Sequence, residues 1–395
     1  MTRKLYSNIY KLYLIKLSKW LMLIMPIVAL FYSENGLSDF DIFLLQAIYS
    51  VSVSVMEIPS GYMADIIGRK KSLIAGSILG TLGFVIYSFS HSFSGFLVAE
   101  IILGLGGSFI SGSDSALLFD SLAAIKLKHK YLQFEGRITS LGNFAETIAA
   151  ICGGMIAAYL SFRSVYIAQT FIAAMAIPAT LLLVEPDREN VTEKPGLQHI
   201  LQVCRNAIFI DKKLSSAIVL SSVIGIATLS MAWCAQVYFI NQDFSEREIT
   251  PLWVSLNLIA AIFAAYASGV RKFLGNRNSL LVIIIYIPLG YILLGQLSLL
   301  AALASLALFY AVRGYATPVL KDLINQNCES ATRATVLSIR NMIIRFGFAL
   351  LGPAIGLISG QYSIGLALSI AGGILLIFSV LSGYRLYRNL PDSYS

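Results

Sequence analysis

Charged residues are scarce in this chain of 395 residues, where Asp, Glu, Lys and Arg together make up 13% and hydrophobic residues make up 57%. The mean hydropathy is +0.76. One water-soluble core could not bury that much apolar surface, so the composition excludes an ordinary soluble domain and makes lipid the expected solvent. A membrane-spanning helix needs roughly 20 mostly apolar residues, so the length allows about twelve spans and leaves no room for a soluble domain beside them.

Cysteine and histidine are also sparse, with four and three residues respectively. The cysteines are scattered, without a Cys-x-x-Cys pair or a nearby histidine cluster, so neither a disulfide framework nor a metal site is expected. The histidines fall in separate predicted loops and form no catalytic group with a nucleophile. No Walker-type lysine follows the glycines between Gly104 and Gly112, so no ATP site is expected. We therefore predict a protein that is not an enzyme and needs no cofactor.

Long apolar runs, separated by short polar interruptions, predict the membrane-spanning helices. A polar stretch at 185–213 separates two groups of runs and is interpreted as a linker between two six-helix bundles, 1–184 and 214–395. The predicted helices lie at 12–33, 41–63, 72–91, 95–119, 138–160, 164–184, 214–238, 250–270, 279–297, 299–320, 335–358 and 362–384.

The basic residues are distributed unevenly among the connections. Most of the 29 lysines and arginines fall in alternate connections, and the opposite connections hold only Arg163 and Arg247. The positive-inside rule then predicts a multi-pass protein of the bacterial inner membrane, with both termini and the central linker in the cytoplasm. This topology explains the net charge of +8 without a nucleic-acid partner.

The two halves repeat one pattern. Gly61–Ser72 follows the second helix and Gly269–Ser279 follows the eighth, and each stretch has a glycine, a basic turn and a serine that opens the next helix. Asp120 and Asp322 close later helices at corresponding places. The common order, at an offset of about 200 residues, predicts an internal duplication of the kind found in secondary transporters.

The stretch Gly61-Tyr-Met-Ala-Asp65-Ile-Ile-Gly68-Arg69-Lys70-Lys71 resembles the loop signature of the major facilitator superfamily between helices two and three. The resemblance implies an all-α membrane fold with 12 transmembrane helices, in two pseudo-symmetric six-helix bundles around a central cavity, that works by alternating access. It implies a gating role for Gly61, Asp65, Gly68, Arg69 and Lys70. Gly61 would allow close helix approach, Gly68 a tight turn, and Asp65 a pairing with basic residues or with a facing helix N-terminus.

The sequence also departs from that family at two places. Many antiporters of the superfamily carry a Gly-Pro motif in helix five, whereas this chain has Cys152-Gly153-Gly154. The basic residue that proton-coupled relatives often carry in helix four is absent from Glu100–Gly107. The usual arrangement for proton coupling is therefore not expected here.

Acidic side chains inside the predicted spans are the candidates for proton coupling. Ionisable groups are costly in lipid and usually face an aqueous cavity or one another. Buried carboxylates can also take up and release protons near neutral pH. Glu100 is ranked lower because it can reach the outer interface, and a permanent ion pair is the alternative reading for every candidate. The proton-coupling candidates are Glu57, Glu146 and Asp114.

Basic side chains inside the spans are the candidates for the substrate cavity. An arginine there either pairs with an acid or receives an anionic group, because its planar fork suits a carboxylate or a phosphate. The substrate-cavity candidates are Lys19, Arg313 and Arg345. An acidic first half and a basic second half fit either salt bridges between the bundles or a zwitterionic or anionic cargo.

The sequence thus predicts a secondary active transporter that moves a small organic solute across the inner membrane, with protons or another ion as the coupling partner. The family resemblance favours export of an amphipathic compound, whereas the arginines in the spans favour an anionic or zwitterionic cargo. Uptake of an anionic or zwitterionic metabolite, such as a siderophore or a carboxylate, is one alternative, and a lipid flippase or a transporter-like sensor is another. We expect a monomer in contact with membrane lipids and no nucleic-acid partner.

Overall fold

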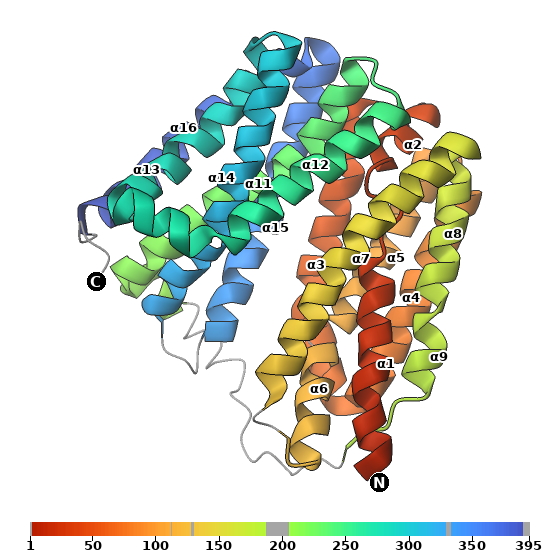
Figure 1. Cartoon of the computed structure of the whole chain (residues 1–395). Helices are drawn as coiled ribbons and strands as arrows, with labels where there is room; N and C mark the ends of the chain where they lie inside the picture. The colour runs from red at the N-terminus through yellow and green to blue at the C-terminus, as the bar shows by residue number, and fades with distance from the viewer. Residues whose placement is uncertain (1, 112, 128–129, 187–204, 329–332, 390–395) are drawn as a thin grey trace. The chain divides into compact units, whose positions relative to one another are not determined.

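The computed structural model describes residues 2–111, 113–127, 130–186, 205–328 and 333–389. These residues form helices and short connections, and no strand occurs among them (Figure 1). Ten helical stretches of the described residues are long and apolar enough to cross a membrane. The predicted all-α membrane fold is therefore confirmed.

The chain divides into two compact units, which are described separately. The first unit comprises Met1–Leu37, Ile48–Thr192 and Phe244–Pro251, and the second comprises Ser38–Ala47, Glu193–Asp243 and Leu252–Ser395. The predicted linker at 185–213 stays a prediction, and most of it, 187–204, lies outside the described residues.

In the first half of the chain, some predicted spans are single helices and others consist of two pieces. The single helices are α3 (Asp39–Ile67), α4 (Arg69–Phe89) and α7 (Tyr131–Tyr159). The spans in two pieces are α1 (Thr2–Trp20) with α2 (Val28–Glu34), α5 (Phe93–Ile110) with α6 (Ser113–Ala124), and α8 (Phe162–Ala174) with α9 (Ala176–Leu181).

The prediction of one continuous helix at 12–33 is wrong, because the helix stops at Trp20 and resumes at Val28. Pro26 lies in the interruption, where it lacks an N–H group and disfavours the helical conformation of Met25 before it. Apolar composition alone did not reveal the break, since residues 21–27 are as apolar as the rest of the run.

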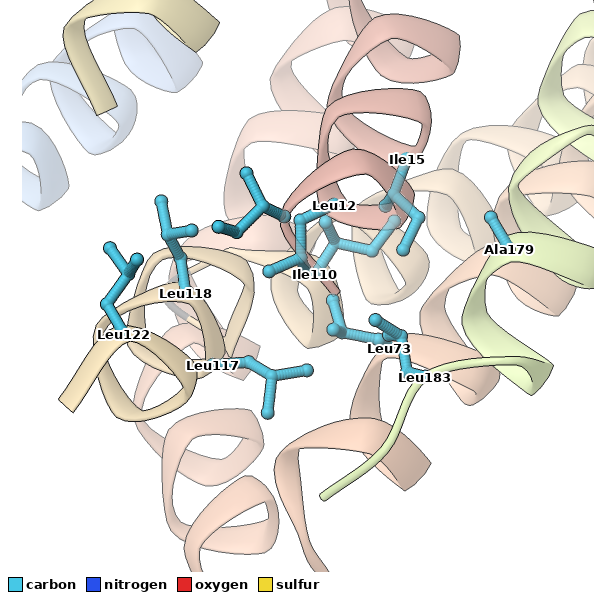
Figure 2. Close-up of a cluster of buried hydrophobic side chains, with 10 residues drawn as sticks. Leu12, Ile15, Leu73, Ile110, Leu117, Leu118, Leu122, Ala179 and Leu183 are labelled. Atoms are coloured by element: carbon cyan, nitrogen blue, oxygen red, sulfur yellow. The ribbon is translucent and has the colours of Figure 1, made fainter. Parts of the chain in front are cut away.

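Helices α1, α4 and α6 pack through one cluster of buried aliphatic side chains, drawn in Figure 2. Because lipid is as apolar as these side chains, the cluster holds the helices by close van der Waals contact. It fixes α1 and α6 against the start of α4, next to the Gly68 turn. Its members are Ile9, Leu12, Ile15, Leu73, Ile110, Leu117, Leu118, Leu122, Ala179 and Leu183.

The second half contains six long helices and a short π-helix that precedes them, η2 (Asn206–Ile210). Asp211 caps the first long helix, since its carboxylate accepts the N–H groups of Lys213 and Leu214, both at 3.0 Å. The long helices are α11 (Lys212–Asn241), α12 (Glu246–Ala265), α13 (Ala267–Gln296), α14 (Leu299–Gln326), α15 (Arg333–Gln361) and α16 (Ile364–Asn389).

The predicted boundary between helices eight and nine, at 270–279, contains the break that the structure shows at Gly275. Helix α12 ends at Ala265, before the predicted end at 270, and α13 begins at Ala267 instead of 279. The true interruption lies inside α13 at Gly275, which has φ 78° and ψ 167°. Gly68 before α4 has φ 106° and ψ 143°. Both glycines adopt a left-handed φ that other residues rarely reach, so the two copies of the repeated pattern share one backbone turn.

Candidate functional site

The break in the first span is held by two helices of the same unit. The backbone N–H of Leu23 donates to the side-chain Oε1 of Gln169 in α8 at 2.8 Å, and Gln169 is fully buried. A Cβ atom added to Gly153 of α7 would lie 1.9 Å from the carbonyl oxygen of Leu23. A backbone group that is not bonded within a helix needs a partner inside a bilayer, and Gln169 supplies it. Gly153 has no side chain and so leaves room for the non-helical segment 21–27.

An ion pair lies close to this break. Lys16 Nζ of α1 is 3.6 Å from Asp114 Oδ2 of α6, and both side chains are 11% exposed. Lys16 also donates to the hydroxyl of Ser115 at 3.2 Å, and the Ser115 N–H donates to Asp114 Oδ1 at 2.6 Å. Lys16 precedes the α1 break by one turn, and Asp114 opens α6 after the interruption of span four. Discontinuous helices of this kind often border the binding sites of secondary transporters.

The turn at Gly68 is fixed by two carboxylates. Arg69 forms an ion pair with Asp120 and donates to the carbonyl oxygen of Ala116 at 2.7 Å. Glu185 accepts the backbone N–H groups of Arg69 at 3.0 Å and Lys70 at 2.7 Å. Glu185 therefore caps the first turn of α4 and satisfies two donors that a helix leaves free at its start.

One residue of the predicted gating motif is described only in part. The side chain of Asp65 lies outside the described residues, so its predicted pairing stays a prediction. A Cβ atom added to Gly61 would meet no described atom within 4 Å, and the close helix approach expected there stays a prediction. Sequence reasoning assigned Glu185 to the linker and missed its cap, because no local pattern joins it to Arg69.

The second unit contains a corresponding pair. Arg271 Nη1 donates to Asp322 Oδ2 at 2.8 Å, and Arg271 Nε donates to Asn276 Oδ1 at 3.0 Å. Arg271 precedes Gly275, whereas Arg69 follows Gly68. Each turn thus places an arginine against the aspartate that closes a later helix, although the side of the turn differs.

The predicted substrate-cavity arginines lie on different helices of the second unit. The Arg313 guanidinium of α14 is 5.0 Å from the ring centre of Tyr310, a cation–π contact. Arg313 Nη1 and the Tyr310 hydroxyl are buried and make no hydrogen bond with any described residue. Arg345 of α15 is partly buried. The joint role of these two arginines at one site stays a prediction.

Arg340 falls inside the predicted helix 335–358 and lies in α15, with 8% of its surface exposed. Its Nε donates to the hydroxyl of Ser221 in α11 at 2.5 Å. Lys19, the remaining basic candidate, lies in the last turn of α1 with an exposed side chain.

The acidic candidates differ in their surroundings. Glu57 of α3 and Glu146 of α7 are both partly buried, and Asp114 is buried in its pair with Lys16. The reading of Glu100 as an interfacial residue is wrong, because it is only 5% exposed. Its Oε1 accepts the hydroxyl of Tyr32 at 2.8 Å and that of Tyr87 at 2.6 Å. The sequence around Glu100 could not reveal these partners, because the two tyrosines lie on other helices.

The long apolar helices and the charges inside them are those of a multi-pass membrane protein, and comparison with known proteins identifies its class. The family model of the Major Facilitator Superfamily matches residues 20–329. The chain belongs to the Major Facilitator Superfamily and is a secondary transporter with the twelve-helix fold of that family.

Two relatives illustrate the range of this similarity. An uncharacterised MFS-type transporter of Methanocaldococcus jannaschii is 23% identical over 384 residues, covering 94% of this chain and 98% of that protein. The quinolone resistance protein NorA of Staphylococcus aureus is 20% identical over 263 residues, covering 66% of this chain and 64% of NorA. The match thus spans slightly under two thirds of NorA.

Solved structures share the fold over nearly the whole chain. A variant of the nucleoside transporter NupG has a TM-score of 0.78 at 13% identity, covering 96% of this chain and 98% of that one. A D-xylose–proton symporter has a TM-score of 0.74 at 14% identity, covering 99% and 98% respectively. At such low identity the likeness concerns the fold alone.

Proposed function

We propose that this protein is a proton-coupled exporter of small amphipathic solutes, acting by alternating access as a monomer in the bacterial cytoplasmic membrane. The observation that carries the proposal is the buried pair of Lys16 and Asp114 beside the break in the first span. In low dielectric, each charge of such a pair is stable only while the other is present. Any cation that reaches Asp114 competes with Lys16 for the carboxylate.

Two cations can take part in this competition. A proton on Asp114 removes its charge and releases Lys16, and a cationic group of the cargo can take the place of the Lys16 ammonium. Because Asp114 cannot satisfy both at once, uptake of one favours release of the other, which is the basis of antiport. The similarity to NorA, a quinolone resistance protein, supports export, and the basic loops support cytoplasmic termini.

The test uses the full chain in inverted membrane vesicles, with ethidium and a quinolone as amphipathic probes. We expect accumulation of a probe that depends on an imposed proton gradient and stops when an uncoupler is added. In Asp114→Asn the gradient should no longer drive accumulation, while Glu248→Gln, which removes an exposed carboxylate from the first turn of α12, serves as the control. Gradient-driven accumulation that persists unchanged in Asp114→Asn would refute the assignment.

Uptake of an anionic solute is the second candidate, and it rests on Arg313. The Nη1 of Arg313, which makes no hydrogen bond with the described residues, is a donor that a carboxylate or a phosphate would satisfy. Right-side-out vesicles and labelled citrate and glycerol phosphate provide the test. Uptake that is lost in both Arg313→Lys and Arg313→Gln would favour this candidate, because lysine cannot reproduce the planar fork.

A further inference from the structure

Three buried oxygen atoms meet at the end of the first unit that lies opposite the Gly68 turn. Tyr32 of α2 and Tyr87 of α4 each contact Oε1 of Glu100 in α5, at 2.8 Å and 2.6 Å, and the two tyrosine hydroxyls also contact each other. The tyrosines are at most 1% exposed and Glu100 is 5% exposed. We call Tyr32, Tyr87 and Glu100 the acid–tyrosine triad.

The number of hydrogens in the triad indicates its protonation state. Each of the three contacts needs one hydrogen between its two oxygens, and each phenol carries only one. An ionised Glu100 carries no hydrogen on its carboxylate. One of the three contacts would then bring the lone pairs of two buried oxygen atoms together without a hydrogen between them. A neutral Glu100 supplies the third hydrogen, so that each of the three contacts has one hydrogen between its two oxygens.

The surroundings of the triad are consistent with a neutral acid. The hydroxyl of Tyr166 in α8 is fully buried beside these rings and has no hydrogen-bond partner among the described residues. Its ring stacks on Tyr87 with 5.0 Å between centroids, and Phe31 and Phe96 close the cluster. A free phenol hydroxyl is a donor that an ionised carboxylate would strongly attract.

Other titratable and charged groups near the triad lie on α8 and α3. From α8, Arg163 stacks 5.4 Å from the ring centre of Phe31 and donates to the carbonyl oxygens of Ser88 and Ser90. Arg163 also contacts His91 Nδ1 at 3.0 Å. From α3, the Tyr49 hydroxyl faces α5 at Gly107, two turns away from Glu100.

We propose that Glu100 is a proton-binding site, a carboxylic acid held neutral by the triad, which ionises only when Tyr32 and α2 separate from α4 and α5. The ligand is a proton, and the reaction is its reversible transfer from the Glu100 carboxyl to water that reaches the opened triad. Tyr87 lies 18 residues along α4 from Arg69, hence about 27 Å from the Gly68 turn. If the proposed orientation is correct, the site lies on the outer side of the membrane, where protons enter.

The test is infrared difference spectroscopy of the purified full-length protein in lipid, which detects the carbonyl stretching band of a protonated carboxyl group. We expect a band at neutral pH that is absent from Glu100→Gln and retained in Glu248→Gln, which removes an exposed carboxylate at the start of α12. Because Tyr32→Phe and Tyr87→Phe each remove one hydrogen bond of the ring, both should shift the band, whereas Tyr166→Phe should leave it in place. Glutamine has the shape of the neutral acid, so Glu100→Gln should fold and run as one species in gel filtration.

Two results would overturn the proposal. Identical carboxyl spectra of the wild type and Glu100→Gln at neutral pH would mean that Glu100 is ionised. A band that persists unchanged at strongly alkaline pH, while the protein stays folded, would mean that the proton never leaves. Neither result depends on transport of a probe, so the test is independent of the export proposal and of the assignment of Asp114.

Discussion

Arg271 donates to Asp322 at 2.8 Å in the second unit, and the partners are separated by 51 residues, the same separation as between Arg69 and Asp120 in the first unit. The duplicated pattern therefore preserves a contact as well as a set of residue types. Arg69 follows the left-handed Gly68, whereas Arg271 precedes the left-handed Gly275. The two units therefore form the same pairing from opposite sides of the turn.

Loss of either aspartate should destabilise its unit. In Asp120→Asn or Asp322→Asn the arginine keeps its charge in a partly buried place without its ionic partner, at a cost of about 1 kcal/mol because both pairs remain partly solvated. Thermal unfolding of the purified protein measures the effect. The pairing itself is tested by the cycle of Arg271→Gln, Asp322→Asn and the double variant, in which purely additive losses would contradict a direct interaction.

Gly153→Ala should disrupt the packing of the first span. The new methyl group would lie 1.9 Å from the Leu23 carbonyl oxygen, so α7 or the interrupted segment must move, at a cost of roughly 3 kcal/mol, the upper end of what overpacking produces. Gly80→Ala is the matched control, because its methyl group meets nothing within 4 Å. Equal melting temperatures for the two variants would contradict the close approach.

Gln169→Leu should destabilise the same segment for a different reason. It keeps the approximate volume but leaves the buried N–H of Leu23 without an acceptor, which costs about 1–3 kcal/mol. We expect a lower melting temperature and faster amide hydrogen exchange at Leu23. Gln169→Glu retains an acceptor oxygen, and exchange at Leu23 as fast as in Gln169→Leu would argue against the bond.

Glu185→Ala should loosen the start of α4. The Arg69 and Lys70 amides lose their shared acceptor, which costs roughly 1 kcal/mol, the usual effect of removing a helix cap. Limited trypsin digestion measures this, because trypsin cleaves after Arg69 and Lys70 once the first turn opens. Glu185→Gln keeps an acceptor oxygen and should be cut more slowly, so equally fast cleavage of both variants would contradict the cap.

The class of protein, the helical fold and the repeated turns were predictable because they depend on local sequence. Apolar runs identify spans wherever they lie, and Gly68 and Gly275 mark turns through their own backbone preference. Asp114 was recognised as a candidate because a charge in an apolar run is conspicuous even without knowledge of its partner.

The partners of these groups were not predictable, because they lie far away in the chain. Gln169 is 146 residues from Leu23, and Glu185 is 116 residues from Arg69. Glu100 was misjudged for the same reason, since its environment is made by Tyr32, 68 residues earlier, as much as by its own helix. Burial and protonation are properties of such distant contacts, whereas hydropathy records only neighbours along the chain.

The break in the first span also bears on biosynthesis. Residues near the amino terminus emerge from the ribosome first, yet the acceptor of the Leu23 N–H is made 146 residues later, with α8. Until then the interrupted span, which also carries Lys16 and Lys19, holds a free donor and two charges that lipid does not tolerate. The first span should therefore settle fully in the bilayer only after α7 and α8 have left the translocon, so the order of synthesis differs from the order of insertion.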